Sequence, residues 1–147
     1  MIITHQTGER DLEMVREGYR RAGLLARVEA FLFDMDKEMK NADLIVCRAG
    51  ATTIAEIAAL ARPAILIPLP AATDDHQRKN ALALESIGAA RLLEQQGLSG
   101  ERLASEITDL CIDTTARIKM SKVVQSFARP DAARLIVDRA FSLIASR

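Results

Sequence analysis

Residues 41–56 combine an apolar strand, a turn of small residues and the start of a helix. Gly50 and Ala51 are small enough to let the backbone approach a bound molecule closely. The N–H groups of residues 51–54 would lie at the positive end of the helix, which favours an anionic oxygen. Arg48, at the end of the strand, either contacts a phosphate or orients the loop. This pattern predicts a place for a phosphorylated, hydroxylated ligand such as a nucleotide.

Glu56 is the acidic residue that we expect in the first turn of this helix. Its carboxylate could accept hydrogen bonds from the two hydroxyl groups of a ribose, as acidic residues do in other nucleotide-binding folds. The spacing Thr53-x-x-Glu56 also matches a capping box, in which Glu56 would accept from the Thr53 backbone N–H. The pattern alone leaves both interpretations open.

A second group of polar residues, 74–80, stands at the predicted start of a later helix. His76 lies four residues before Asn80 and Gln77 lies three before it, so each can share a helix face with Asn80. Amide and imidazole groups of this kind could hold the hydroxyls of a sugar. The alternative is an exposed helix start capped by Asp74 through Gln77. We expect no metal site, because neighbouring acidic residues point in different directions on a helix.

Two further features have simpler interpretations. His5-Gln6-Thr7-Gly8 forms a polar loop after a short strand, and an ordinary turn explains it equally well. Cys47 has no histidine or aspartate in a triad-like pattern, so we interpret it as a core residue and not as a nucleophile.

The elements that must position these residues alternate along the chain. Short apolar strands between helices predict a parallel sheet with helices on both faces, an α/β fold of the Rossmann type. Ligands in such sheets bind at the carboxyl ends of the strands. We expect strands at 1–5, 27–33, 43–47, 64–67 and 90–93, and helices at 9–22, after Asp34, and at 52–61, 74–87, 99–111, 113–126 and 131–145.

Composition limits the classes of function. The 147 residues suit one domain, 1–147, and the balance of 20 basic and 20 acidic residues argues against a nucleic-acid partner. Two separated cysteines fit a reducing compartment. No stretch reaches the roughly 18 apolar residues that span a bilayer, so we expect a soluble chain with peripheral membrane contact left open.

The segment 42–56 resembles the donor-site signature of the MurG family, the N-acetylglucosaminyltransferases that make lipid II for bacterial peptidoglycan. The resemblance continues through residues 62–68 and 75–81, and includes His5–Gly8 and 129–133. It implies the C-terminal half of a GT-B glycosyltransferase. The first strand, the glycine- and serine-rich phosphate loop and the acceptor domain of that fold have no counterpart in these residues.

The resemblance also implies roles for particular residues in binding UDP-N-acetylglucosamine. The ribose and phosphates would lie against Ala51, Thr52, Thr53, Ile54, Ala55 and Glu56, with Glu56 on the ribose hydroxyls. Leu32 would meet the uracil through its backbone, and Gln77 would contact the donor sugar. Arg48, Gly50, His76 and Asn80 are additional candidates. It implies no catalytic residue in this chain, no metal and no cofactor.

In the intact enzyme, the family's reaction transfers N-acetylglucosamine to lipid I with inversion, at the cytoplasmic face of the bacterial inner membrane. The acceptor would be bound by the other domain, so this chain alone would be inactive. The alternatives are a separately encoded, non-catalytic half that needs a partner chain, and another UDP-sugar-binding α/β protein such as an epimerase. The last helix, with an apolar face that includes Ile136, Phe141 and Ile144, would cross a domain boundary and promote self-association.

Overall fold

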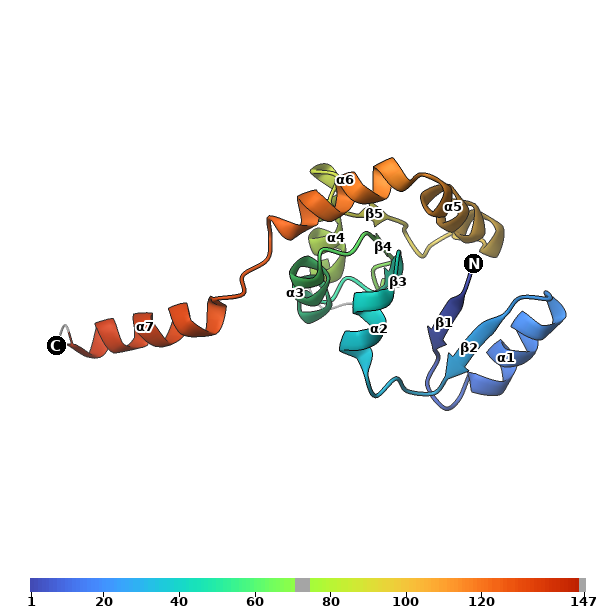
Figure 1. Ribbon diagram of the computed structural model, residues 1–147, viewed down its shortest axis with the longest axis horizontal. Helices are drawn as coiled ribbons and strands as arrows, with labels where there is room; N and C mark the ends of the chain where they lie inside the picture. The colour runs from blue at the N-terminus through green and yellow to red at the C-terminus, as the bar shows by residue number, and fades with distance from the viewer. Residues whose placement is uncertain (71–74, 146–147) are drawn as a thin grey trace. The chain divides into compact units, whose positions relative to one another are not determined.

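A computed structural model describes residues 1–70 and 75–145 of the chain (Figure 1). The contacts group these residues into two compact units, Met1–Asn41 and Ala42–Arg147, and each is described by itself. Both units contain parallel strands joined through helices, which confirms the predicted α/β class.

The first unit is built from two β–α pairs. Strand β1 (Ile3–Gln6) pairs in parallel with β2 (Ala26–Glu29), and helix α1 (Leu12–Arg21) makes the crossover between them. Helix α2 (Met35–Asn41) follows β2. Leu12, Val15 and Tyr19 are half-buried at helical spacing, as predicted, and Val28 and Met39 are buried.

Strand β2 is shorter than the predicted strand 27–33. Its partner β1 ends at Gln6, and the Thr7 and Gly8 N–H groups then extend the pairing by loop hydrogen bonds to the carbonyls of Glu29 and Ala30. The N–H of Leu32 donates to the Gln6 side chain at 2.8 Å. Phe31 and Phe33 are exposed and contact each other edge to face. The apolar sequence after Glu29 therefore forms a loop held by a side chain.

The second unit holds a three-stranded parallel sheet in the order β3-β4-β5. Its elements are β3 (Ile45–Cys47), α3 (Ala51–Leu60), β4 (Ala64–Leu66), α4 (His76–Ser86), β5 (Arg91–Leu92), α5 (Gly100–Ile112), α6 (Thr114–Gln125) and α7 (Ala132–Ala145).

The central strand β4 lies in the core of this unit. All three of its residues are fully buried, as expected for a parallel strand that is covered on both faces. Ile65 packs with Leu93, Leu110 and Met120, so α5 and α6 are tied to the sheet by one apolar cluster. The carboxyl ends of β3 and β4 are thereby fixed relative to each other within this unit.

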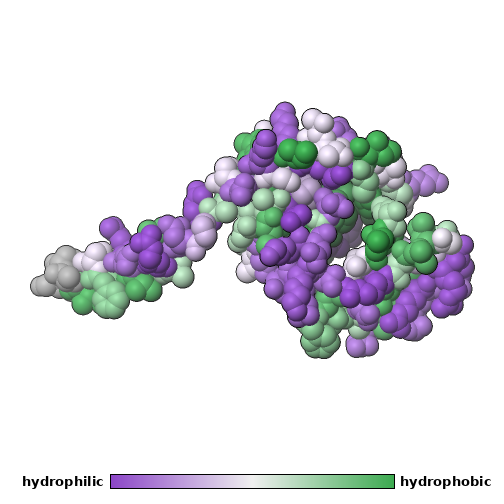
Figure 2. Space-filling view, in the orientation of Figure 1, coloured by the Kyte–Doolittle hydropathy of each residue, from purple (hydrophilic) through white to green (hydrophobic). Residues whose placement is uncertain are grey.

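Helix α7 has a different environment. Residues 132–144 are all exposed, including Ile136, Phe141 and Ile144. Figure 2 shows hydrophobic residues along one side of the helix and hydrophilic residues along the other. The apolar face that the sequence predicts is present, and nothing among the described residues buries it.

The predicted elements occur in the predicted order, with ends that shift by a few residues. The sequence predicts a single sheet. The described residues instead form two parallel sheets, one of two strands in the first unit and one of three strands in the second. No helix among residues 1–70 and 75–145 combines the length and the apolar character that crossing a membrane requires.

Candidate functional site

The turn between β3 and α3 contains Gly50, the residue directly before the first residue of the helix. Gly50 has φ −68° and ψ 147°, an extended conformation that any residue can adopt. A Cβ at this position would meet only the Thr53 hydroxyl, at 3.8 Å. Neither the backbone nor the packing of the chain requires glycine here, so any need for it would come from a ligand outside the turn.

The start of α3 has no side-chain cap. The N–H of Ile54 donates to the Gly50 carbonyl at 3.0 Å, which begins the helical ladder and removes Ile54 from the set of amides available to a ligand. The N–H groups of Ala51, Thr52 and Thr53 precede that first bond, and an α-helix offers such groups no acceptor of its own. Residues 51 and 52 are exposed. The predicted anion-binding start is therefore three amides long, one fewer than the sequence indicated.

Glu56 is the sixth residue of α3 and lies in its second turn, so the prediction that it occupies the first turn was wrong. The capping box was wrong for the same reason. The helix begins at Gly50, which makes Thr53 the third helical residue and leaves it unable to act as the cap. Glu56 is exposed. The interpretation of Glu56 as a cap no longer competes with the ribose prediction.

Cys47 is the β3 residue whose electrostatic environment connects it to Glu56. Burial and, to a smaller extent, the nearby Glu56 carboxylate raise the pKa of the Cys47 thiol to about 12. A thiol that remains protonated at neutral pH is a poor nucleophile. This supports the interpretation of Cys47 as a core residue.

Arg48 connects three loops at the carboxyl edge of the sheet. Its Nη1 donates to the carbonyls of Ile67 and Pro68, at 3.0 and 3.2 Å, and to Gln95 Oε1 at 2.6 Å. Ile67 and Pro68 follow β4, and Gln95 follows β5. Of the two interpretations left open by the sequence, this geometry favours loop orientation.

Helix α4 brings the second predicted polar group to the same turn. Asn80 Nδ2 donates to the Ala49 carbonyl at 3.2 Å, so the starts of α3 and α4 lie side by side. Gln77 Oε1 accepts from the Leu69 N–H at 3.0 Å and holds the loop after β4. Asn80 thus brings the start of α4 against the turn 48–50.

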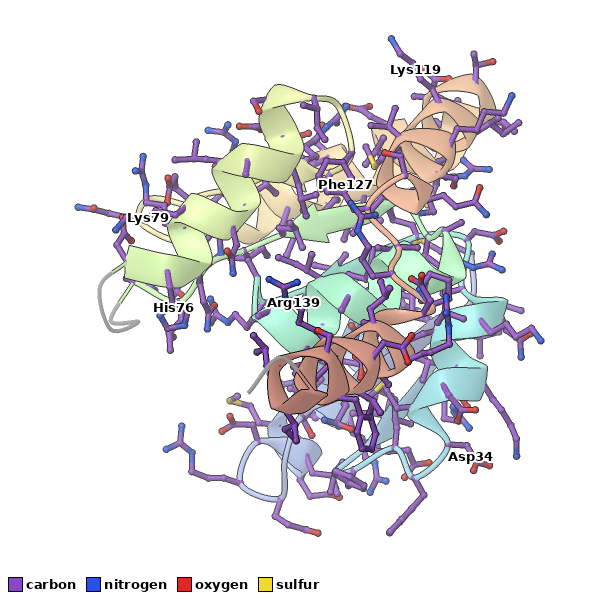
Figure 3. All side chains as sticks on the ribbon, turned by 90° about the vertical axis from the view of Figure 1, so that its left-hand side faces the viewer. Asp34, His76, Lys79, Lys119, Phe127 and Arg139 are labelled. Atoms are coloured by element: carbon purple, nitrogen blue, oxygen red, sulfur yellow. The ribbon has the colours of Figure 1, made fainter. Side chains whose placement is uncertain are left out.

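His76 opens α4 after Asp75, which has a left-handed φ of 56° and forms no side-chain cap. Figure 3 shows His76 and Lys79 projecting from the beginning of this helix in different directions. The predicted cap at Asp74 lies outside the described residues.

Leu32 belongs to the first unit and is considered there alone. Its side chain is buried, and its N–H is already bonded to Gln6 Oε1. Sequence reasoning missed this role of Gln6, although the position of Gln6 at a strand end in a polar loop was a signal. It also missed Gln95, for which the sequence offered none.

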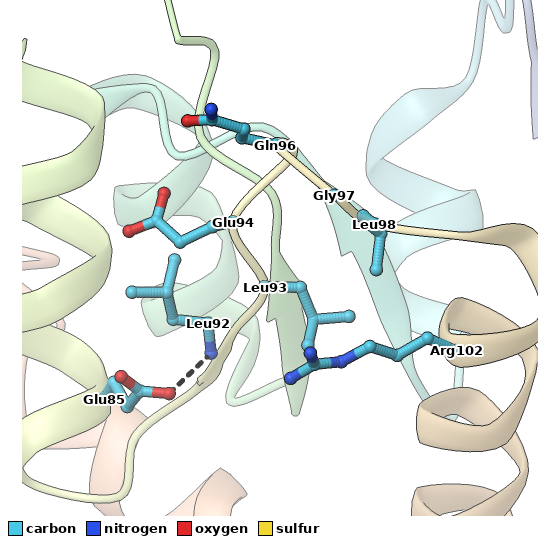
Figure 4. A pocket seen from close by; sticks show the side chains of 8 residues that line it. All are labelled: Glu85, Leu92, Leu93, Glu94, Gln96, Gly97, Leu98 and Arg102. Atoms are coloured by element: carbon cyan, nitrogen blue, oxygen red, sulfur yellow. Dashed lines mark hydrogen bonds between the residues drawn. The ribbon is translucent and has the colours of Figure 1, made fainter.

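The described residues of the second unit line shallow hollows. One, of about 340 Å³, adjoins Arg48 and is lined by Val46, Cys47, Arg48, Ile67, Gln95 and Leu98. The other, of about 280 Å³, is shown in Figure 4. Glu85 forms part of its wall and accepts from the Leu92 N–H. The second hollow contains none of the predicted site residues.

Within the described ranges, no group of three or more His, Cys, Asp or Glu side chains is placed to hold a metal ion.

The fold and the edge geometry define a class: a parallel α/β protein whose polar residues gather beyond the carboxyl ends of its strands. Comparison with known proteins specifies the family. The family model described as "Glycosyltransferase family 28 C-terminal domain" matches residues 1–136. The chain belongs to this family.

Relatives and solved structures agree with that assignment. A UDP-N-acetylglucosamine–N-acetylmuramyl-(pentapeptide) pyrophosphoryl-undecaprenol N-acetylglucosamine transferase of Pelobacter propionicus is 53% identical over 92% of this chain and 36% of its own length. The protein of the same name from Anaeromyxobacter sp. (strain Fw109-5) is 44% identical over the whole chain and 39% of its own length. The crystal structure of Acinetobacter baumannii MurG superimposes with a TM-score of 0.85 at 37% identity, covering 94% of this chain and 40% of that one.

More distant structures share the fold. The spinosyn forosaminyltransferase SpnP has a TM-score of 0.69 at 16% identity. The chain spans less than two fifths of the length of the curated relatives just described.

Proposed function

We propose that residues 1–147 form one donor-binding domain for UDP-N-acetylglucosamine, acting in the transfer of N-acetylglucosamine to lipid I during peptidoglycan synthesis. The observation that carries the proposal is the uncapped start of α3, held beside α4 by Asn80 at the carboxyl edge of the sheet. The names of the relatives supply the sugar and the acceptor class.

The start of α3 would bind the diphosphate. The N–H groups of Ala51, Thr52 and Thr53 would donate to phosphate oxygens, and Ile54 and Ala55 continue the same surface of the helix. Gly50 would allow the phosphate to approach the turn closely, because any other residue would place a side chain in the space beside the Thr53 hydroxyl. As the glycosidic bond breaks, the same amides would stabilise the negative charge that develops on the departing UDP.

The nucleoside and the sugar would use the remaining candidates. Glu56 would accept from the ribose hydroxyls. It is exposed and is not used as a cap. Leu32 would offer its backbone to the uracil, and the Gln6 amide that holds it would fix that part of the backbone. Gln77 and His76, at the start of α4, would contact the N-acetylglucosamine group.

Titration calorimetry with UDP tests this assignment. We expect the parent chain to bind UDP and the Glu56→Ala variant to bind roughly ten- to a hundredfold more weakly, because a hydrogen bond to a charged group contributes roughly 1.5–3 kcal/mol. Glu101→Ala is the matched control, since Glu101 is an exposed carboxylate in the first turn of α5. Equal affinities of the parent and Glu56→Ala would contradict the ribose role. No binding by the parent would contradict a donor site in this chain.

The rest of the reaction would depend on parts outside this chain. Lipid I would bind to a separate acceptor domain, and no residue of this chain would be catalytic. This agrees with a chain that spans less than two fifths of the length of the Pelobacter propionicus relative. The intact enzyme would act at the cytoplasmic face of the membrane as a peripheral protein. Mixing the chain with a purified acceptor domain of a relative should yield transfer that neither component gives alone.

The exposed face of α7 would also mediate self-association of the isolated chain. The support is a row of exposed apolar side chains. Three of them, Ile136, Phe141 and Ile144, are each more than 60% exposed. Sedimentation should show a dimer or larger species at high concentration, and Phe141→Ser should shift it toward monomer. A parent chain that stays monomeric at every concentration would refute this.

A further inference from the structure

We propose that Arg48 is a positioning residue, whose guanidinium ties the loops after β4 and β5 to the turn that begins α3. The inference rests on the proposed function where it concerns ligand affinity, and on the hydrogen bonds alone where it concerns the loops. Arg48 would thus act through the backbone of the site and not by touching a phosphate.

The first support is the set of acceptors. Beyond the end of β4 the sheet offers no further strand residue to the carbonyls of Ile67 and Pro68, and Arg48 Nη1 donates to both. Pro68 is buried and Ile67 is partly buried, so the bonds from Arg48 replace part of the hydration that folding removes from this segment. A guanidinium that moved away to bind a phosphate would leave them without this donor.

The second support is Gln95, which accepts from the same nitrogen at 2.6 Å. Arg48 and Gln95 are 47 residues apart, so this bond closes a long loop of the chain. Together the contacts make Arg48 a link between β3, β4 and β5 at the edge where the α3 amides lie.

The third support is the complementary bond from α4. Asn80 Nδ2 holds the Ala49 carbonyl, the residue directly after Arg48. The turn is therefore held from two sides, by the Arg48 side chain toward β4 and β5 and by Asn80 toward α4. Loss of either should increase the freedom of the first turn of α3.

The first experiment needs no ligand. Amide hydrogen exchange is measured on the parent, Arg48→Met, Gln95→Leu and Gln95→Glu, with Arg102→Met as the control. Met keeps the stem of Arg48 but removes its donors, and Arg102 is an exposed arginine whose side chain lies in the other hollow. We expect faster exchange at Ile54, Ile67 and Leu69, whose N–H groups are hydrogen-bonded in the parent, for Arg48→Met and Gln95→Leu. Gln95→Glu should slow it, since a charge-assisted bond is stronger.

The second experiment separates positioning from phosphate contact. A positioning residue affects the whole of α3, so UDP and uridine should both bind about three- to tenfold more weakly to Arg48→Met, the range expected for one hydrogen bond. Gln95→Leu should give a smaller loss, and the double variant should lose less than the two single losses combined.

The two experiments distinguish the possible failures. If Arg48→Met weakens UDP binding alone, leaves uridine binding and exchange unchanged, and Gln95→Leu has no effect, Arg48 is a phosphate ligand and the inference is overturned. Unchanged exchange in both Arg48→Met and Gln95→Leu also overturns it. If the parent fails to bind UDP while exchange changes as expected, the proposed function fails and the positioning role stands. Gln95→Leu keeps the test available should Arg48→Met not fold.

Discussion

Ionisation of Cys47 provides a quantitative test of the electrostatics beside the candidate site. The thiol pKa is raised to about 12 in the folded chain, compared with an ordinary value of 9.0, chiefly by burial and then by Glu56. The folded state therefore holds the proton more tightly than the unfolded state. The stability that this contributes is fully present below pH 9 and is lost as the pH rises from 9 toward 12.

The size of the effect follows from the two pKa values. At pH 10 an unfolded thiol of pKa 9.0 is mostly ionised, whereas the folded thiol of pKa about 12 is not. The difference lowers the free energy of unfolding by about 1.4 kcal/mol between pH 7 and pH 10, because each unit of pH above the unfolded pKa contributes about 1.36 kcal/mol.

The assay is urea denaturation at pH 7, 9 and 10 in a Cys111→Ser background, which leaves Cys47 as the only thiol. Cys47→Ala on that background is the control. The two variants share all their other titratable groups. The difference between their stability-versus-pH curves therefore reports the Cys47 thiol alone. A Glu56→Gln variant should lose nearly the same stability between pH 7 and pH 10, because burial, the larger cause of the raised pKa, still keeps the folded thiol protonated.

One result would refute the reasoning. If the parent and Cys47→Ala lose the same stability between pH 7 and pH 10, Cys47 ionises equally in both states, and its environment is neither dry nor close to the Glu56 charge.

Three further predictions concern stability elsewhere. Burial lowers the pKa of His5, so the chain should lose stability as the pH falls below about 6.5, and His5→Gln should flatten that loss in urea denaturation from pH 7.5 to 5. Ala61 ends α3 with a left-handed φ of 51°, so Ala61→Gly should stabilise the chain by about 1 kcal/mol, while Ala59→Gly in the helix interior should destabilise it by a similar amount. Leu66→Ala should cost about 2–5 kcal/mol, whereas exposed Leu82→Ala should cost far less; equal losses would contradict the assigned core.

The order and type of the elements could be predicted because apolar periodicity and turn residues are local signals. Residues 64–66 are a short, entirely apolar run before a proline, and they form the buried central strand. The end of β2 could not be predicted in this way. Phe31 and Leu32 continue the apolar pattern, but the backbone pairing ends at the bond from the Gly8 N–H to the Ala30 carbonyl, and the Gln6 side chain holds the Leu32 N–H instead.

The start of α3 was harder to predict for a related reason. Both Gly50 and Thr53 are acceptable helix starts, and the sequence does not choose between them. In the structure the helix begins at the earlier residue, which moves Glu56 into the second turn and removes the capping box. Glu56 still lies in α3, but it is farther along the helix from the first amides than the sequence indicated.

The polar side chains at this edge divide into two groups, and the division bears on how the site would recognise a ligand. Arg48, Gln77 and Asn80 each hydrogen-bond to the backbone of a neighbouring loop. The amides of residues 51–53 have no acceptor within the helix, and the Glu56 carboxylate is exposed in its second turn. A ligand bound here would therefore meet mainly backbone donors, the Glu56 carboxylate and the Gln77 side chain, on a surface that Arg48 and Asn80 shape without touching the ligand. Substitutions at Arg48 or Asn80 should then alter affinity by loosening loops, which hydrogen exchange detects without any ligand present.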